Sequence, residues 1–284
     1  MNQGPESDWL AAPRAAVTGL LLVIWTLAMI PPQALLMACR SRAARVLPMI
    51  YHRGVCRLIG LHVKRSGEAA VAGPALFVSN HTSYIDIVVL QAALQASFVA
   101  KSEVAGWPLI GLLARLGNSL FIERRPSHAG AQSNEMRRRL EAGESLILFP
   151  EATSSDGNRI LPFRSALFSV VEEPLAGRVI PVQPISLVYT HANNLPMSRR
   201  DRPFLTWYGG TELLPHLWQI LCRGPATAEL KFYPPMTITD YRSRKELARA
   251  CEHRIARGVS AALAGRGSTP PARAGTAPAP ARSA

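Results

Sequence analysis

The chain has 284 residues, of which 48% are hydrophobic, and its 32 basic and 19 acidic residues leave a net charge of +13. This length allows one large domain, and the basic excess implies an anionic partner, either nucleic acid or a membrane surface. The most basic stretch, residues 40–65, offers only Tyr51 for stacking on bases, so we expect a membrane partner and no nucleic acid. The four cysteines have neither a CxxC pair nor metal-ligand spacing, and we expect no metal site.

The N-terminal part of the chain is predicted to contain a membrane segment. After a polar lead over residues 1–14, sixteen uncharged residues run from Ala15 to Ile30, and the apolar character continues past Pro31-Pro32 to Cys39. A helix of that uncharged run would extend about 24 Å, against a hydrocarbon core of about 30 Å. Two membrane interpretations fit: a tilted span over residues 15–39 kinked at the prolines, or a helix that dips in and bends back. A buried helix of a soluble protein is the alternative.

Seven basic residues and no acidic ones lie between Arg40 and Arg65. Basic residues beside an apolar segment attract anionic lipid headgroups by about 1 kcal/mol each, and they favour the cytoplasmic side for the chain that follows. We therefore assign residues 15–69 to a membrane segment with a basic interfacial region, and we expect the remaining chain on the cytoplasmic side.

Residues 70–264 are predicted to form an α/β domain. Short apolar runs bounded by turn formers indicate buried strands at residues 74–79, 97–101, 119–122, 145–149 and part of 179–188. Helices are predicted between them over residues 83–94 and 127–142, and an apolar residue at every fourth position predicts another over 244–264. Strands that alternate with helices indicate a mixed, largely parallel sheet flanked by helices. The tail over residues 265–284 is rich in Pro, Ala and Gly and is predicted to be disordered.

The stretch Asn80-His-Thr-Ser-Tyr-Ile-Asp86 follows the first of these strands. Histidine is the side chain best suited to remove a proton from a hydroxyl near pH 7, and a carboxylate on its other ring nitrogen holds the required tautomer. Positions five apart diverge on a regular helix, so His81 must lie in the loop and Asp86 in the first helical turn. The spacing alone is weak evidence, because an ordinary histidine beside a helix-capping Asn80 or Ser83 gives the same pattern.

With that stretch as the first block, three further blocks follow, and each has a structural alternative. The second block, Gly117 to Arg125, ends a strand in two arginines that suit a phosphate or carboxylate, although a solvated strand end would look the same. In the third block, Phe149 to Gly157, Glu151 could hold a substrate hydroxyl or orient arginines, whereas Asp156-Gly157 is also an ordinary turn signal. In the fourth block, Val179 to Val182, Pro181 interrupts an apolar strand as at a sheet edge or bulge.

In order and spacing, the four blocks resemble the lysophosphatidic-acid acyltransferase family, within the glycerolipid acyltransferases, over roughly residues 70–190. The resemblance implies a glycerolipid-acyltransferase-like fold, with His81 as general base and Asp86 as its orienting partner. It also implies a substrate-binding set, with Arg124 on the phosphate, Glu151 in the acceptor block and Pro181 near the acyl donor. Thr153 and Arg164 complete the set. The donor would be acyl-ACP or acyl-CoA as co-substrate, with no metal or other cofactor and with oxyanion donors near the 79–83 turn.

The chain departs from that family in the third block, where Ala152 replaces glycine and Ser154 replaces arginine. Arg164 could compensate for the missing arginine, or the acceptor could carry less charge. Residues 153–168, together with Trp207-Tyr-Gly and Pro215-His-Leu-Trp218, are similar to bacterial lyso-ornithine-lipid acyltransferases.

The resulting expectation is a membrane-associated O-acyltransferase at the bacterial inner membrane, which moves an acyl group from a thioester to a lysolipid hydroxyl. The leading acceptor is 1-acyl-glycerol-3-phosphate, with phosphatidic acid as product, and lyso-ornithine lipid is the alternative. A thioesterase or a non-catalytic lipid-binding protein remains as a further alternative.

Overall fold

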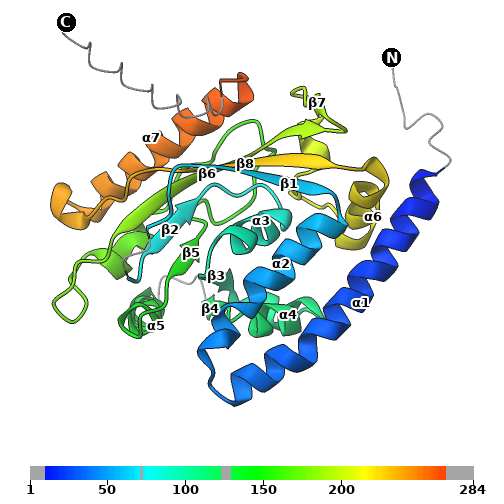
Figure 1. Ribbon diagram of the computed structural model, residues 1–284. Helices are drawn as coiled ribbons and strands as arrows, with labels where there is room; N and C mark the ends of the chain where they lie inside the picture. Colours follow the sequence, from blue (N-terminus) through cyan, green and yellow to red (C-terminus); the bar gives the residue numbers. More distant parts are fainter. Residues whose placement is uncertain (1–9, 71–72, 123–128, 267–284) are drawn as a thin grey trace, which may run out of the picture.

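A computed structural model describes residues 10–70, 73–122 and 129–266, and it is built around one mixed sheet (Figure 1). The strand order is β1-β8-β6-β2-β5-β3-β4, and a short β7 pairs with β6. The β6–β8 and β6–β7 pairs are antiparallel and the other pairs are parallel. The strands are β1 (Leu61–Ser66), β2 (Leu76–Ser79), β3 (Ser97–Lys101), β4 (Leu120–Ile122), β5 (Leu146–Leu148), β6 (Val182–Ala192), β7 (Leu195–Pro196) and β8 (Ala226–Phe232).

This architecture is the mixed, largely parallel α/β sheet predicted from the sequence, and all five predicted strands are present. The sheet starts before the predicted domain boundary at residue 70, because β1 pairs in parallel with β8. Neither strand is among those predicted from the sequence, and for β1 the physical reason lies in its composition. At the edge of the sheet β1 carries the exposed charges Lys64 and Arg65, so its composition indicated a basic surface segment and not a strand.

Helices cover both faces of the sheet (Figure 1). Phe77 of β2 lies in the core shared with α2 and α3, whereas Leu76 and Val78 lie in the core shared with α5 and α7. This alternation buries β2 on both sides, which explains its uninterrupted apolar sequence. The helices are α1 (Ala11–Ala38), α2 (Leu47–Leu58), α3 (Ile85–Ala93), α4 (Ile110–Leu116), α5 (Ala129–Glu141), α6 (Leu213–Arg223) and α7 (Arg244–Leu263).

Helix α1 begins at Ala11, inside the predicted polar lead, and continues through Pro31 and Pro32. It is long and apolar enough to cross a membrane. Pro13 lies in its first turn, where the missing N–H costs no helical hydrogen bond. In Figure 1 α1 runs along the outside of the molecule beside α2. The two helices approach closely at Gly54, where a Cβ would lie 2.5 Å from the Trp25 ring.

Hydrogen bonds tie α1 to the α/β domain along its length. Near the start, Arg14 donates to the Cys222 carbonyl oxygen of α6 at 3.0 Å. In the middle, the Trp25 indole N–H donates to the Tyr51 carbonyl oxygen at 3.1 Å. Beyond the prolines, the Gln33 amide donates to the carbonyl oxygens of Ala44 and Leu116 at 3.0 and 2.7 Å. Helix α1 is therefore part of the folded body and does not project away from it.

Candidate active site

The loop between β2 and α3 starts at Asn80, which is buried. Its side-chain amide donates to the Leu187 carbonyl oxygen, and its side-chain oxygen accepts the Leu187 N–H, both at 2.9 Å. The side chain thus continues the pairing with β6 after the β2 backbone has turned away. His81 follows directly and lies at the carboxyl end of β2, where ligands bind in parallel sheets.

The structure brings His81 and Asp86 together, with His81 Nδ1 2.9 Å from Asp86 Oδ2. Asp86 lies in the first turn of α3 and is fully buried. The same Oδ2 accepts the backbone N–H groups of Thr82 and Ser83 at 2.6 and 2.8 Å. These donors, with the positive end of the helix dipole, stabilise the ionised carboxylate. Because Nδ1 faces Asp86, Nε2 is the ring nitrogen left to accept a proton.

Two aromatic residues that sequence reasoning missed complete the surroundings of this pair. The His81 ring stacks on Phe149, with ring centroids 4.0 Å apart. Tyr189 of β6 is buried, and its hydroxyl donates to Asp86 Oδ1 at 2.7 Å. No local motif marks Tyr189, because it reaches Asp86 only through the pairing of β2 with β6.

Glu151, predicted to hold a substrate hydroxyl or orient arginines, instead holds the backbone of the His81 loop. Its Oε1 accepts the His81 N–H and its Oε2 accepts the Leu161 N–H, both at 2.9 Å. The His81 carbonyl oxygen in turn accepts the Ser155 N–H at 3.0 Å. Burial raises the pKa of Glu151 to about 8, against the opposing effect of the two N–H donors. Both carboxylate oxygens are thus engaged within the protein.

The turn after Glu151 has a left-handed residue, Ala152, with φ of 62°. This is the position where the resemblance implies glycine. Ser154 and the exposed Thr153 follow, and all three residues line a cavity beside His81. The Ser154 hydroxyl donates to the Trp207 carbonyl oxygen, and the Trp207 N–H donates to the Thr82 carbonyl oxygen at 2.8 Å. Ser154 thus anchors the Trp207 segment against the His81 loop.

The backbone N–H groups of residues 81–83 cannot serve as the oxyanion donors expected near this turn. The His81 N–H is held by Glu151, and those of Thr82 and Ser83 are held by Asp86. Within the described part of the chain, the N–H groups of Thr153 and Ser154 donate to no protein group. Consecutive backbone N–H groups in a turn are available to bind an anion when no protein group accepts them.

Arg164 and Pro181, the other predicted residues that the structure describes, make no hydrogen bond to His81. Arg164 is exposed, and its N–H donates to the Pro150 carbonyl oxygen at 2.9 Å, which places it beside the 149–152 turn. Pro181 immediately precedes β6, and its carbonyl oxygen accepts the Leu76 N–H at the start of β2. Because β2 and β6 run parallel, Pro181 lies at the opposite end of β2 from His81. Arg124 falls outside the described residues.

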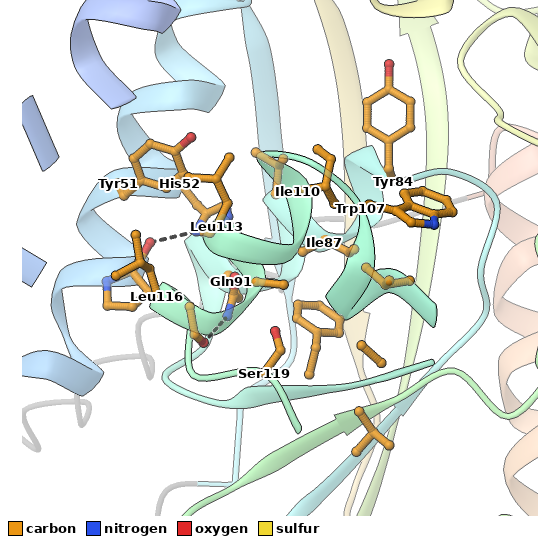
Figure 2. Close-up of a pocket in the computed structure, with 18 of the residues that line it drawn as sticks. Tyr51, His52, Tyr84, Ile87, Gln91, Trp107, Ile110, Leu113, Leu116 and Ser119 are labelled. Atoms are coloured by element: carbon orange, nitrogen blue, oxygen red, sulfur yellow. Dashed lines mark hydrogen bonds between the residues drawn. The ribbon is translucent and has the colours of Figure 1, made fainter. Parts of the chain in front are cut away.

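A cavity of about 490 Å³ opens beside His81 (Figure 2). Its wall is mostly apolar and comes from α1, α2, α3, α4 and β3. Figure 2 shows Tyr84 and Trp107 on one side of it, and Tyr51, His52 and Leu116 on the other. Because His81 and residues of α1 and α2 all line the cavity, it extends from the histidine toward these two helices. Among the described residues, no three His, Cys, Asp or Glu side chains form a possible metal site.

Comparison with known proteins identifies the family of the chain. The Acyltransferase family profile matches residues 61–188. A lyso-ornithine lipid O-acyltransferase of Brucella abortus is 42% identical over 249 residues, which cover 86% of this chain and 93% of that protein. The chain belongs to the acyltransferase family. It is an enzyme that acylates lysolipids, in place of the thioesterase and non-catalytic alternatives.

Two further relatives of this acyltransferase match different shares of its chain. A lyso-ornithine lipid O-acyltransferase of Rhizobium meliloti is 40% identical over 258 residues, or 89% of this chain and 88% of that protein. A 1-acyl-sn-glycerol-3-phosphate acyltransferase of Neisseria gonorrhoeae is 35% identical over 111 residues, or 39% of this chain and 43% of that protein.

The fold of the acyltransferase also matches a solved structure. The crystal structure of the 1-acyl-sn-glycerophosphate (LPA) acyltransferase from Thermotoga maritima superposes with a TM-score of 0.65 at 21% identity. The match covers 92% of this chain and 98% of that one, so it includes the helices as well as the sheet.

Proposed function

We propose that this acyltransferase acylates lyso-ornithine lipid, in preference to the leading sequence-based expectation, 1-acyl-glycerol-3-phosphate. The observation that carries the proposal is the extent of similarity. Proteins named for lyso-ornithine lipid align with 86% and 89% of the chain, whereas the glycerophosphate enzyme of Neisseria gonorrhoeae aligns with 39%.

The third block supports the same acceptor on physical grounds. A phosphate monoester carries up to two negative charges and is held best by paired arginines. Ser154 occupies the position where the resemblance implies such an arginine, and its hydroxyl is engaged with the Trp207 carbonyl oxygen. The remaining candidates, Arg164 and Arg124, give the acceptor site less positive charge than the family pattern would.

The proposed chemistry starts at His81 Nε2, which removes the proton from the acceptor hydroxyl. The oxygen attacks the carbonyl carbon of the acyl thioester, and the tetrahedral intermediate collapses with release of the thiolate. The imidazolium returns its proton to the departing sulfur. Asp86 stabilises the imidazolium through Nδ1, 2.9 Å away, so that the ring keeps one orientation throughout.

The oxyanion of the tetrahedral intermediate is assigned to the N–H groups of Thr153 and Ser154. Both residues line the cavity that also contains His81, and their N–H groups have no acceptor within the described residues. Donors aimed at a developing oxyanion contribute about 3–4 kcal/mol each to such reactions.

The acyl chain of the donor is assigned to the apolar cavity. At about 490 Å³ the cavity has the size of a small-molecule site, which is about 300–1,000 Å³. Its wall is lined with residues such as Ile87, Val88 and Leu113, which suit a hydrocarbon chain. The thioester then lies beside His81, with its carrier, acyl carrier protein or CoA, outside the protein.

The outer surface of α1 is assigned as the part of the enzyme that contacts the membrane. Leu20 and Leu27 of α1, and Leu214 of α6, are each more than 60% exposed. Exposed apolar side chains on adjacent helices form a patch that favours a lipid surface. Because hydrogen bonds tie α1 to the domain at Arg14, Trp25 and Gln33, we place the helix along the membrane surface. The enzyme would lie on the cytoplasmic face of the bacterial inner membrane.

The test of the acceptor is a direct comparison on membranes that contain the enzyme. Lyso-ornithine lipid and 1-acyl-glycerol-3-phosphate are supplied separately with acyl-ACP or acyl-CoA, and the diacyl products are measured. A higher kcat/KM for lyso-ornithine lipid is expected, with kcat about 10²–10⁴-fold lower in His81→Ala membranes. A higher value for the glycerophosphate would reverse the proposed order of acceptors.

The test of the membrane surface is sedimentation with phosphatidylglycerol vesicles. Leu20→Gln combined with Leu27→Gln should reduce the bound fraction. Leu195→Gln, at an exposed position in β7, is the matched control and should leave it unchanged. Equal binding by both variants would move the membrane contact to another surface.

A further inference from the structure

Tyr189 is the only side chain of β6 bonded to the His81–Asp86 pair among the described residues. The two oxygens of Asp86 have largely different hydrogen-bond donors. Oδ2 accepts His81 Nδ1 and the N–H groups of Thr82 and Ser83, whereas Oδ1 accepts the Tyr189 hydroxyl at 2.7 Å. The Thr82 hydroxyl lies between them, 3.2 Å from Oδ1 and 3.4 Å from Oδ2.

The backbone around Tyr189 holds its side chain in place. Two residues earlier, Leu187 is clamped by both side-chain bonds from Asn80. Directly after it, the pairing of β6 with β8 shifts register between Tyr189 and His191. A bulge at such a point changes the direction of the strand and of its side chains, and bulges are common beside active sites. The Tyr189 hydroxyl is therefore directed at Asp86 by features on both sides of it.

The groups around the hydroxyl keep it a donor. Burial and the Asp86 carboxylate raise the pKa of Tyr189 well above its ordinary range. Its titratable neighbours are Tyr84 in the loop and Cys56 on α2, and burial raises the pKa of both. Glu151, on the far side of the His81 loop, has its pKa raised to about 8. No cation competes for Asp86 Oδ1 among its described partners.

We propose that Tyr189 is a positioning residue that sets the proton affinity of the catalytic histidine through Asp86. A strong donor on Oδ1 draws negative charge away from Oδ2, where the imidazolium is stabilised. The phenol thereby weakens the stabilisation that Asp86 gives to the imidazolium of His81. The inference rests on the proposed function of His81 and Asp86. It adds Tyr189 as the third residue of one hydrogen-bonded series, which runs from Tyr189 on β6 through Asp86 on α3 to His81 in the loop.

The test is the pH dependence of kcat/KM in Tyr189→Phe. With the donor removed, more charge remains on Oδ2, the imidazolium gains stability, and the acid limb of the profile moves to higher pH. A shift of about half a unit to one unit is expected from the loss of part of one charge-assisted hydrogen bond. The plateau value should fall less than tenfold, far less than the loss in His81→Ala.

A second variant gives the opposite sign. Replacing Tyr189 with 3,5-difluorotyrosine keeps the shape and makes the phenol a stronger donor, so the acid limb should move to lower pH. If Tyr189→Phe fails to fold, the fluorinated variant still tests the inference, because it keeps both the shape and the hydroxyl of tyrosine. Tyr233→Phe is the matched control, because the Tyr233 hydroxyl bonds Ser186 of β6 and does not touch the pair. It should leave the midpoint unchanged.

The outcomes separate this inference from the proposed function. An unchanged midpoint in both Tyr189 variants, with His81→Ala inactive, would overturn the role of Tyr189 and leave the base in place. Turnover retained in His81→Ala would overturn the proposed function itself. An equal shift in Tyr233→Phe would also overturn the inference, because a general effect on the sheet would then explain both.

Discussion

The His81 N–H donates to Glu151 Oε1 at 2.9 Å, across seventy positions of sequence. This bond joins the first and third sequence blocks, which the sequence alone presents as separate features. Since Glu151 also accepts the Leu161 N–H, one buried carboxyl group connects the loop of His81, the proposed base, with the segment around Leu161. The third block therefore supports the proposed base and also forms one side of the cavity.

The first prediction is that His81→Ala removes activity and leaves the fold intact. General-base catalysis contributes about 10²–10⁴ in rate, and kcat should fall by that factor. Asp86→Asn should also lose activity, because the imidazolium loses its counter-charge. The measurement is kcat at saturating substrates, with thermal unfolding as the control for folding. Near-normal turnover in His81→Ala would show that His81 is not the base of the reaction.

The second prediction concerns the pH dependence of stability through Glu151. Burial raises the pKa of Glu151 from an ordinary 4.5 to about 8. Between those values the folded state keeps a proton that the unfolded state has lost, so the free energy of unfolding falls as pH rises through this window. Glu151→Gln should have a shallower slope between pH 5 and 8 in urea titrations. Identical slopes in the two proteins would contradict the raised pKa.

The third prediction is that Ala152→Gly stabilises the protein. Ala152 has φ of 62°, and the left-handed conformation costs an L-residue about 1–2 kcal/mol, partly offset by the greater backbone entropy that glycine loses. The net gain should be about 0.5–1 kcal/mol. Ala261→Gly in α7 is the control and should destabilise by about 1 kcal/mol. Loss of stability in Ala152→Gly would show that the methyl group makes compensating contacts.

The fourth prediction concerns the acceptor. Ser154→Arg should raise kcat/KM for 1-acyl-glycerol-3-phosphate relative to lyso-ornithine lipid, because it adds a cation to the third block. Ser154→Ala is the control, since it removes the bond to the Trp207 carbonyl oxygen without adding charge. The ratio of the two kcat/KM values is measured for all three proteins. An equal ratio in the Arg and Ala variants would mean that charge at this position does not select the acceptor.

The fifth prediction concerns the acyl chain. Ala114 of α4 lines the cavity, and Ala114→Phe should reduce its volume and shift the preference toward shorter acyl donors. Leu112→Phe lies on the same helix at an exposed position outside the cavity wall and should leave the preference unchanged. The measurement is product formation from acyl-ACP of graded chain length. The same preference in both variants would place the acyl chain elsewhere.

Local sequence patterns predicted most of the fold correctly, and their failures have identifiable causes. Strand β2 was recognised because its residues are apolar on both faces, and α3 because an apolar run follows the loop. The sequence places β1 in the basic interfacial region, because two consecutive residues of this strand, Lys64 and Arg65, carry exposed charges. The polar lead was set at residues 1–14, whereas α1 starts at Ala11.

Local sequence patterns were enough to predict the pairing of His81 with Asp86, the family resemblance and the apolar N-terminal helix, because each depends on residues that lie close together in the chain. Only the tertiary structure decided which distant groups complete the site. Tyr189 reaches Asp86 through the pairing of β2 with β6, Glu151 binds the His81 backbone, and Pro181 lies at the far end of β2. The physical reason is that strand order and register decide which distant residues meet, and a local pattern contains neither.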